Sequence, residues 1–367
     1  MEHNLLTLDF WRDTVCYEGR VVPTGTLACA ALNIPDESIT SLTEPCESVQ
    51  AFLATLNSIM PDVSLLPPAK TAAEQILKTL HSYAPFSWGD LNFYLSGLEK
   101  AFTEESIQEL QAWSFALMTK TLTEDSMTEL RHGILLGKLT MLLAQMADSL
   151  RLFKDAMGEF AGMLDADSAD RSPDGLAVMF AKAFPTEASF TGTDWMSMLN
   201  ATLQYFSANR EDQEAPILVK RMHFVSFVGM LRADLFEGLS VGHAPKRCRI
   251  CGKWFLTVNA RHTKYCGSLA PGDKRGRTCR QIGNLQGRES RELAADHPLK
   301  QLYERRMNSI QRSVKRGKLD PELAEAMKRL AKDKLYKAIS NNNYAQTRYE
   351  AEMEQVALLE EAKRFIS

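Results

Sequence analysis

The sequence predicts a mainly α-helical protein with a small cysteine finger, and two features of its 367 residues lead to that prediction. Apolar residues recur at three- and four-residue steps through residues 125–164, which is the period of a helix packed on one face. Four of the seven cysteines lie between Cys248 and Cys279, inside the most basic part of the chain. We therefore predict three parts: an acidic, mostly helical domain over residues 1–244, a small cysteine finger over residues 245–287, and a charged helical C-terminal extension over residues 288–367.

The N-terminal domain is predicted to be helical apart from its first 30 residues. There, short stretches rich in β-branched residues on either side of Glu18-Gly19 favour a small hairpin. Further along, prolines and glycines separate segments with a helical period. Besides residues 125–164, the predicted helical segments are residues 48–60, 72–83, 104–122, 194–206 and 215–236.

The net charge of the chain is only -3, but the balance of basic and acidic side chains differs strongly from one segment to the next. Residues 1–244 carry 16 basic and 32 acidic side chains, residues 245–320 carry 19 and 6, and residues 321–367 carry 8 and 8. The basic excess of the middle segment is typical of a surface that meets a polyanion. The same side chains could instead pair with the acidic N-terminal domain, and composition leaves both alternatives open.

The spacing of the cysteines predicts a zinc site. Cys248 and Cys251 are separated by two residues and can bind one ion, and Cys266 and Cys279 complete a tetrahedral set of thiolates at about 2.3 Å from the metal. Four protein ligands leave no open position, so we predict one structural Zn2+. A disulfide framework is the alternative, but it is typical of small secreted chains with paired cysteines, whereas this chain is long and has seven.

The residues around the ligands predict a treble-clef-like finger. Gly252 permits a tight turn directly after the first two cysteines, where backbone N–H groups can face the sulfurs. Three histidines flank the cluster and remain alternative ligands, namely His243, His262 and His297. In chain order we expect a strand at residues 253–258, a turn at 259–260, a returning strand at 261–265 that delivers Cys266, a solvated loop at 267–278, and a helix that opens at Cys279.

This segment resembles the CGNR-type zinc finger, which lies at the C-terminal end of bacterial proteins with a helical N-terminal domain. Residues 279–284, Cys-Arg-Gln-Ile-Gly-Asn, stand where that family has its short Cys-Gly-Asn-Arg signature, and the 12-residue gap after Cys266 is longer than the family's. The matching residues are Cys248-x-x-Cys251, Gly252, Phe255 and residues 261–265 leading into Cys266.

The resemblance covers about residues 239–283 and marks the chain as a divergent relative or an analogue. The chain is similar, more closely, to an uncharacterised group of bacterial proteins with a longer final loop and a basic helical tail. Because the CGNR-type proteins are regarded as transcriptional regulators, the resemblance implies a regulatory role.

Basic side chains on the predicted finger make nucleic acid the expected ligand. A metal-held frame would present arginine and lysine to phosphates, and arginine forks to guanine edges. The candidate contact residues are Arg249, Lys253, Arg261, His262, Lys264, Lys274, Arg275, Arg277 and Arg280.

The C-terminal extension is predicted to be a series of charged helices. Pro298 is expected to restart the first helix, residues 314–319 to end it, and residues 341–343 to interrupt the chain again. Asp320 and Pro321 have the residue types of an N-cap and a first helical position. These helices could pack on the finger, form a homo-oligomer, or present basic side chains to DNA.

No catalytic residues are predicted, because the sequence lacks both a Gly-x-Ser-x-Gly elbow and a His-Glu-x-x-His motif. An enzyme in the N-terminal domain stays open. The chain starts without a secretory signal and has no uncharged apolar run of about 18 residues, which predicts a cytoplasmic protein with no membrane span.

We hypothesise a zinc-dependent nucleic-acid-binding protein, with DNA as the partner and transcriptional regulation as the role. The N-terminal domain would sense a ligand or mediate assembly. The alternative is a zinc-stabilised protein–protein interaction module that binds no nucleic acid.

Overall fold

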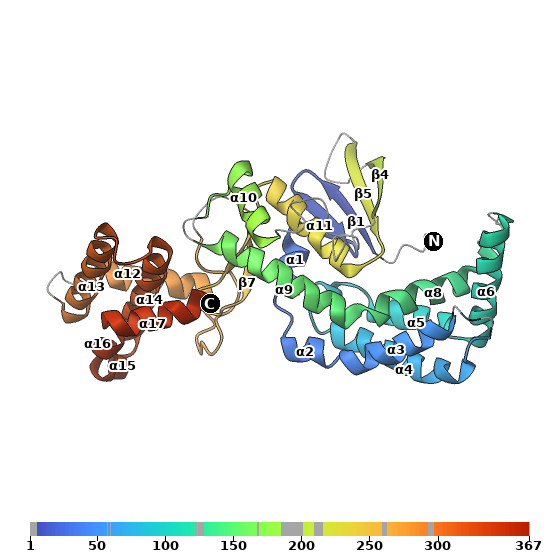
Figure 1. Ribbon diagram of the computed structural model, residues 1–367, viewed down its shortest axis with the longest axis horizontal. Coiled ribbons are helices and arrows are strands. Elements are labelled where there is room, and N and C mark those ends of the chain that lie inside the picture. The colour runs from blue at the N-terminus through green and yellow to red at the C-terminus, as the bar shows by residue number, and fades with distance from the viewer. Residues whose placement is uncertain are drawn as a thin grey trace. The chain divides into compact units, whose positions relative to one another are not determined.

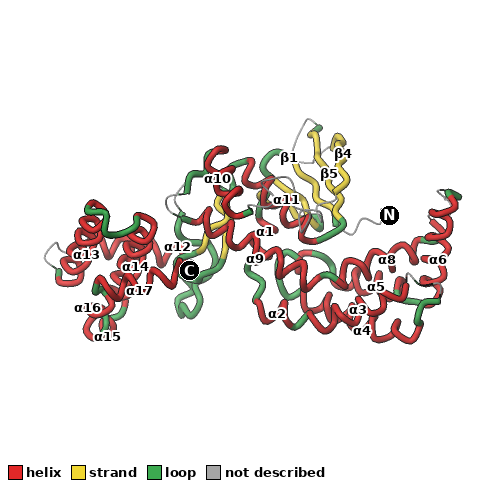
Figure 2. The backbone as a smooth tube through the Cα atoms, in the orientation of Figure 1, coloured by secondary structure: helices red, strands yellow, loops and turns green. Residues whose placement is uncertain are grey.

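The protein is described by a computed structural model covering residues 6–56, 58, 60–121, 123, 128–166, 169–184, 201–208, 216–258, 263–292 and 297–366. The chain divides into two compact units. The N-terminal unit comprises residues 1–247 and 252–263, and the C-terminal unit comprises residues 248–251 and 264–367. Helices dominate the described residues and strands are few (Figures 1 and 2), so the mainly α-helical prediction is confirmed.

A five-stranded antiparallel sheet lies in the N-terminal unit (Figure 2), and its strand order is β3-β2-β1-β5-β4. Glu18 and Gly19 join β2 to β3, and both have positive φ, 51° and 71°, as in the tight turns of two-residue hairpins. The predicted hairpin is therefore confirmed, as part of a larger sheet. The strands are β1 (Thr7–Trp11), β2 (Thr14–Tyr17), β3 (Arg20–Pro23), β4 (Ala201–Ala208) and β5 (Ile217–Phe224).

The helix predicted at residues 194–206 is wrong in its described part, and the helix predicted at residues 215–236 is wrong over residues 217–224 but confirmed over residues 227–236, which belong to a helix. β4 and β5 pair with each other along eight residues, and β5 also pairs with β1. Residues 194–200 and 215 lie outside the described residues. Both strands are rich in β-branched and aromatic side chains, which fit a pleated sheet better than a helix.

One ion pair joins two neighbouring strands of this sheet, β1 and β5. The Arg221 guanidinium on β5 donates to both carboxylate oxygens of Asp9 on β1, at 2.7 and 2.8 Å. Asp9 and Arg221 are directly opposite each other in the strand register. A cross-strand pair with this two-pronged geometry fixes the register of β5 against β1.

The helices of the N-terminal unit share one apolar core with the sheet. Phe52, Leu136 and Phe153, from three different helices, are completely buried. The helical period predicted over residues 125–164 is confirmed in its described part, but the segment forms two helices because Gln145 leaves helical geometry (φ -101°, ψ 7°). The helices are α1 (Thr26–Ala31), α2 (Asp36–Thr40), α3 (Thr43–Leu56), α4 (Leu66–Leu80), α5 (Leu91–Ala101), α6 (Glu104–Thr119), α8 (Arg131–Ala144), α9 (Met146–Asp165), α10 (Pro173–Ala183) and α11 (Phe227–Ser240).

The last two strands of the N-terminal unit, β6 (Ala244–Arg247) and β7 (Trp254–Thr257), pair antiparallel. Asn33, which follows α1, holds β7 through the oxygen and the nitrogen of its side-chain amide. Its Oδ1 accepts a hydrogen bond from the Trp254 N–H at 2.7 Å, and its Nδ2 donates to the Trp254 carbonyl at 2.8 Å. The hairpin is thus fastened to the helical core of its own unit.

The C-terminal unit is a helical cluster with a separate apolar core. Ile310, Met327 and Met353 are completely buried at its centre. The same unit contains an ion network, in which the Lys334 ammonium contacts the carboxylates of both Glu352 and Glu361 at 2.8 Å. The helices are α12 (Cys279–Glu292), α13 (Pro298–Lys315), α14 (Pro321–Ser340), α15 (Asn342–Thr347), α16 (Tyr349–Glu352) and α17 (Gln355–Ile366).

The breaks predicted in the C-terminal extension are confirmed. Pro298 is the first residue of α13, and Pro321 is the first residue of α14. The Asp320 carboxylate caps α14 by accepting hydrogen bonds from two backbone N–H groups of its first turn, at 2.9 and 3.3 Å. The break predicted at residues 341–343 is a single residue, because Asn341 separates α14 from α15 and residues 342 and 343 already belong to α15. No helix among the described residues combines the length and the apolar character needed to cross a bilayer.

Candidate metal centre

Four cysteine thiols converge in the C-terminal unit. The sulfurs of Cys248, Cys251, Cys266 and Cys279 all lie within 4.8 Å of one another. Cys251 is partly exposed and the other three are buried. Tetrahedral zinc with sulfur at about 2.3 Å requires sulfur–sulfur separations of about 3.8 Å, and Cys251 and Cys266 are 3.6 Å apart. The donor set and its spacing therefore fit one metal ion, as the sequence predicts.

Backbone hydrogen bonds hold the first three cysteines in place. The Arg249 N–H donates to the Lys264 carbonyl at 3.1 Å, which fastens the turn between the first two cysteines to the segment before Cys266. The Cys266 N–H points at the Cys248 sulfur at 3.4 Å. Gly252 has φ of 72°, which is the conformation expected of it after the Cys-x-x-Cys turn.

Two of the thiols have pKa values that are shifted in opposite directions. Burial raises the pKa of the Cys248 thiol, but hydrogen bonds from the backbone N–H groups of Cys251, Cys266 and Ile250 outweigh burial and lower that pKa to about 7. Burial and the neighbouring thiols raise the pKa of Cys279 above its usual range. Four sulfurs gathered this closely favour a bound cation, because it relieves the repulsion that deprotonating all of them creates.

The predicted strand at residues 253–258 is confirmed as β7, but its predicted partner is wrong. β7 pairs with β6, which precedes the first two cysteines, because the Cys-x-x-Cys turn itself reverses the chain. Residues 263–265 form no strand, and residues 259–262 lie outside the described residues.

The loop between the last two cysteines is mostly exposed, as predicted, but it has internal structure. Asp273 organises it: its carboxylate accepts from the backbone N–H groups of Arg275 and Arg277 at 3.2 and 2.8 Å and from the Arg277 guanidinium at 2.6 Å. These hydrogen bonds lower the pKa of Asp273 to about 2. Leu269 and Thr278 form a bridge that closes the loop.

A capping box starts the helix that carries the fourth cysteine. The Thr278 N–H donates to Gln281 Oε1 at 2.8 Å, and the Gln281 N–H donates to Thr278 Oγ1 at 3.2 Å. This reciprocal pair makes Cys279 the first residue of α12, as predicted. The sequence Thr-x-x-Gln is the signal that would have identified these two positioning residues in advance.

Tyr265 and Gly283 also position the site and were missed in the sequence. A Cβ atom at Gly283 would lie 2.4–2.5 Å from three ring carbons of Tyr265, so only glycine lets α12 approach this ring. Tyr265 directly precedes Cys266, and Gly283 lies one turn after Cys279. The contact therefore ties together the segments that carry the last two thiols.

The sequence offers three histidines as alternative metal ligands. The two that the structure describes make hydrogen bonds to other groups. The His243 ring is buried in the N-terminal unit, where its Nδ1 hydrogen-bonds with the Thr24 carbonyl at 2.8 Å. His297 caps α13 by accepting from the Leu299 N–H at 3.3 Å. His262 lies outside the described residues.

The candidate nucleic-acid contacts have different surroundings. Arg277 is paired with Asp273, and Arg249 and Lys264 lie within electrostatic range of Asp333 on α14. Lys253 is exposed and belongs to the N-terminal unit, whereas Arg261 and His262 lie outside the described residues. The candidates exposed in the C-terminal unit are Lys274, Arg275 and Arg280.

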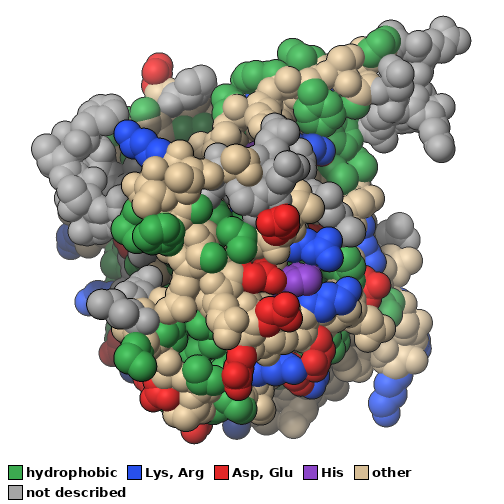
Figure 3. All heavy atoms as spheres, turned by 90° about the vertical axis from the view of Figure 1, so that its right-hand side faces the viewer, with side chains coloured by type: hydrophobic (Ala, Val, Ile, Leu, Met, Phe, Trp, Pro, Cys, Tyr) green, Lys and Arg blue, Asp and Glu red, His purple; other side chains and the backbone are tan. Residues whose placement is uncertain are grey.

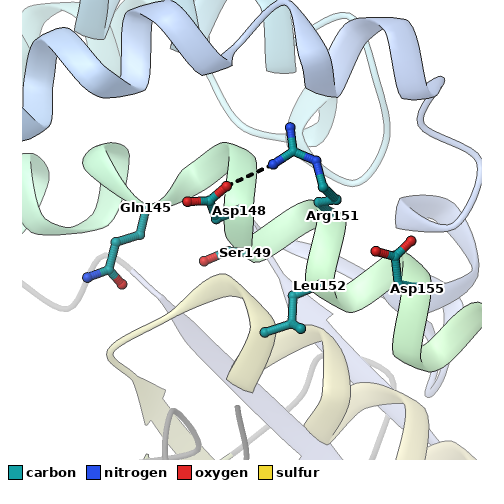
Figure 4. A pocket seen from close by; sticks show the side chains of 6 residues that line it. All are labelled: Gln145, Asp148, Ser149, Arg151, Leu152 and Asp155. Carbon is teal, nitrogen blue, oxygen red and sulfur yellow. Dashed lines mark hydrogen bonds and ion pairs between the residues drawn. The ribbon is translucent and has the colours of Figure 1, made fainter. Parts of the chain in front are cut away.

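A pocket of about 350 Å³ lies along α9 in the N-terminal unit (Figure 4). Asp148 and Arg151 line it and bind each other at 2.8 Å, three residues apart on an exposed helix face. On the face drawn in Figure 3, acidic, basic and apolar side chains of the described residues are interspersed.

A family model described as a family of unknown function (DUF6076) matches residues 196–365. This match includes the four cysteines and extends through almost all of the C-terminal helices. Neither the curated proteins nor the solved structures contain a match to the chain.

Proposed function

We propose that the four cysteines bind one structural Zn2+ and that the C-terminal unit is a zinc-dependent nucleic-acid-binding module. The observation that carries the proposal is the convergence of four thiols within 4.8 Å, three of them buried. An all-sulfur tetrahedral donor set favours zinc over magnesium or calcium, which prefer oxygen. Four protein ligands close the coordination shell, so the ion would stabilise the fold rather than act on a substrate.

The chain order of the elements supports a treble-clef-like finger. A strand, a Cys-x-x-Cys turn, a second strand and a helix that begins at the fourth ligand follow one another. All seven cysteines are free thiols among the described residues, which suits a reducing compartment, and we place the protein in the cytoplasm on that ground.

Charge supports nucleic acid as the ligand. The C-terminal unit contains 23 basic and 14 acidic residues, although the whole chain is net acidic. Lysine and arginine held on a rigid frame displace counterions from phosphates. A role in transcriptional regulation rests on the resemblance to CGNR-type proteins. In that role the N-terminal unit would sense a ligand or mediate assembly.

A second candidate function is the binding of a protein partner through the same unit. The Asp273–Arg277 ion pair favours it, because a carboxylate of the chain itself already satisfies one of the candidate cations. A protein partner would use the finger as a rigid docking element without contacting phosphate.

The test combines metal analysis with a salt titration. Purified protein should contain one zinc ion per chain, and its binding to random-sequence duplex DNA should weaken steeply with salt, with a log–log slope of about -0.9 per neutralised phosphate. Fluorescence anisotropy of labelled DNA gives the affinity, and a chelated sample should not bind. Zinc at one ion per chain without DNA binding at low salt would favour the protein partner.

A further inference from the structure

The outward face of α13 is polar and mostly basic. Ile310 is completely buried in the apolar core of the C-terminal unit, and Leu302 and Val314 pack against that core, so these residues mark the inward face. On the other side, every exposed residue of this fully described helix except Pro298 is polar or charged. These residues are Gln301, Glu304, Arg305, Asn308, Gln311, Arg312 and Lys315.

Three cations share one stripe of this face. Arg312 lies about two helical turns after Arg305, and Lys315 follows three residues later. A turn after α13 adds Arg316 and Lys318, both exposed, at the end of the stripe. Two backbone hydrogen bonds, of 2.9 and 3.0 Å, close this turn against the last residues of α13 and fix its geometry. We call these five cations the α13 surface.

The side chains of the α13 surface make no ion pair and no hydrogen bond with another described residue. Elsewhere, cations on helices meet a carboxylate three residues away, as Lys328 does on α14 and Arg151 on α9. A place in the last turn suits Arg312 and Lys315, because cations favour the C-terminal end of a helix dipole, but Arg305 lies in the middle of α13. Like charges at this spacing repel one another, which favours the binding of an external polyanion.

The α13 surface is carried by a helix that is fixed on its inner side. The Tyr349 hydroxyl donates to the Leu299 carbonyl at 3.0 Å, and the Ser309 hydroxyl donates to Gln355 Oε1 at 2.7 Å. Helix α13 packs against α14, and α14 packs against α12, which begins at Cys279 (Figure 1). The segment that holds the metal ligands therefore supports α13 through α14.

We propose that the C-terminal unit binds the phosphate backbone of duplex DNA through the α13 surface. This inference rests on the proposed function and adds contact residues outside the cysteine finger. Charge complementarity carries the choice of partner: residues 298–320 contain seven basic and two acidic side chains, and one of the acids, Asp320, is engaged in capping α14. The 18 residues of α13 extend over about 27 Å, so the helix can meet several phosphates of one duplex.

Charge-neutral variants of the full chain test the surface. We expect Arg305→Gln and Arg312→Gln each to weaken binding to random-sequence duplex DNA about three- to tenfold at low salt, and to reduce the log–log salt slope by about 0.9 for each phosphate that is no longer neutralised. Glutamine favours a helix about as well as arginine, so zinc content and circular dichroism should not change. The matched controls are Lys363→Gln and Arg364→Gln, exposed on α17, which should change the affinity less than about twofold.

Glu304→Gln is a variant whose expected effect has the opposite sign. Glu304 is the one acidic residue of α13, and its carboxylate repels phosphate from the face that it shares with Arg305. Its removal should strengthen DNA binding about two- to fivefold at low salt. Unchanged or weaker binding by Glu304→Gln, with zinc content and fold intact, would show that phosphate does not approach this face.

The outcomes separate this inference from the proposed function. Wild-type protein that binds no DNA at low salt overturns both, and binding to poly-glutamate that Arg305→Gln weakens would then identify an acidic protein partner for this face. Wild-type protein that binds DNA, but loses as much affinity in Lys363→Gln as in Arg305→Gln, keeps the proposed function and overturns the α13 surface.

Discussion

The proposed zinc site depends on each of its cysteines individually. Cys279 is completely buried and is the first residue of α12, so Cys279→Ser removes one ligand from a shell that has no spare donor. We expect this variant to retain only a small fraction of one zinc ion per chain after dialysis against a weak chelator, measured by elemental analysis. Cys16→Ser, on β2 and outside the cluster, is the control and should keep its zinc. Full zinc content in Cys279→Ser would refute the four-thiol site.

Gly283 is the second residue whose side chain decides the geometry of the site. We expect Gly283→Ala to lower the free energy of unfolding of the C-terminal unit by about 1–3 kcal/mol, because the new Cβ overlaps the Tyr265 ring. Gly287→Ala on the same helix is the matched control. A Cβ there meets no atom within 4 Å, so the change should be neutral or stabilising by up to about 1 kcal/mol. Urea denaturation of both variants measures the difference, and equal stabilities would contradict the overlap.

At the scale of elements, a carboxylate on α11 caps the distant helix α1. Asp234 is completely buried and accepts hydrogen bonds from the N–H groups of Gly25 and Ala28, at 2.8 and 3.0 Å. Gly25 occupies the cap position and has no side chain to do this itself. Burial raises the pKa of Asp234 to about 7, although these hydrogen bonds favour its charged form.

That raised pKa predicts how the stability of the N-terminal unit changes with pH. In the unfolded chain Asp234 loses its proton near pH 4, whereas in the folded chain it keeps the proton up to about pH 7. Its contribution to stability therefore falls as pH rises between these values, by at most about 1.4 kcal/mol per pH unit. We expect Asp234→Asn to remove this decline, measured by urea denaturation at pH 5, 6, 7 and 8. The same decline in both proteins would contradict the assignment.

The elements that the sequence predicts best are those with a local signal. The period of α8 and α9 and the Asp320-Pro321 start of α14 are local, and both are confirmed. β4 and β5 were predicted as helices because apolar residues in short segments fit both periods, and the partner that decides between them, β1, is about 200 residues away in the sequence. A short stretch of sequence contains no information about a strand partner that lies so far along the chain.

The same distinction applies within the candidate site. The spacing of Cys248, Cys251, Cys266 and Cys279 predicts their convergence because one ion needs four donors. The role of Gly283 could not be predicted, since it depends on where the Tyr265 ring lies after folding. Likewise, a pattern confined to the finger does not reveal that Asp333 of α14 lies within electrostatic range of Arg249 and Lys264.

At the scale of the whole molecule, the two units have separate apolar cores, and all four thiols belong to the C-terminal unit. Metal binding is therefore expected to stabilise the C-terminal unit selectively, since zinc in small fingers contributes folding free energy of about 10–16 kcal/mol. We expect chelation to increase amide hydrogen exchange in α12 and α14, while α3, α8 and α9 keep their protection. Mass spectrometry of exchanged peptides measures this.

Cys279→Ser without chelator should reproduce that exchange pattern, which separates loss of the metal from other effects of the chelator. Equal loss of protection in both units would show that the metal stabilises the whole chain. In that case the route to the N-terminal core would be the β6–β7 hairpin, because its Trp254, three residues after Cys251, carries the backbone groups to which Asn33 is hydrogen-bonded.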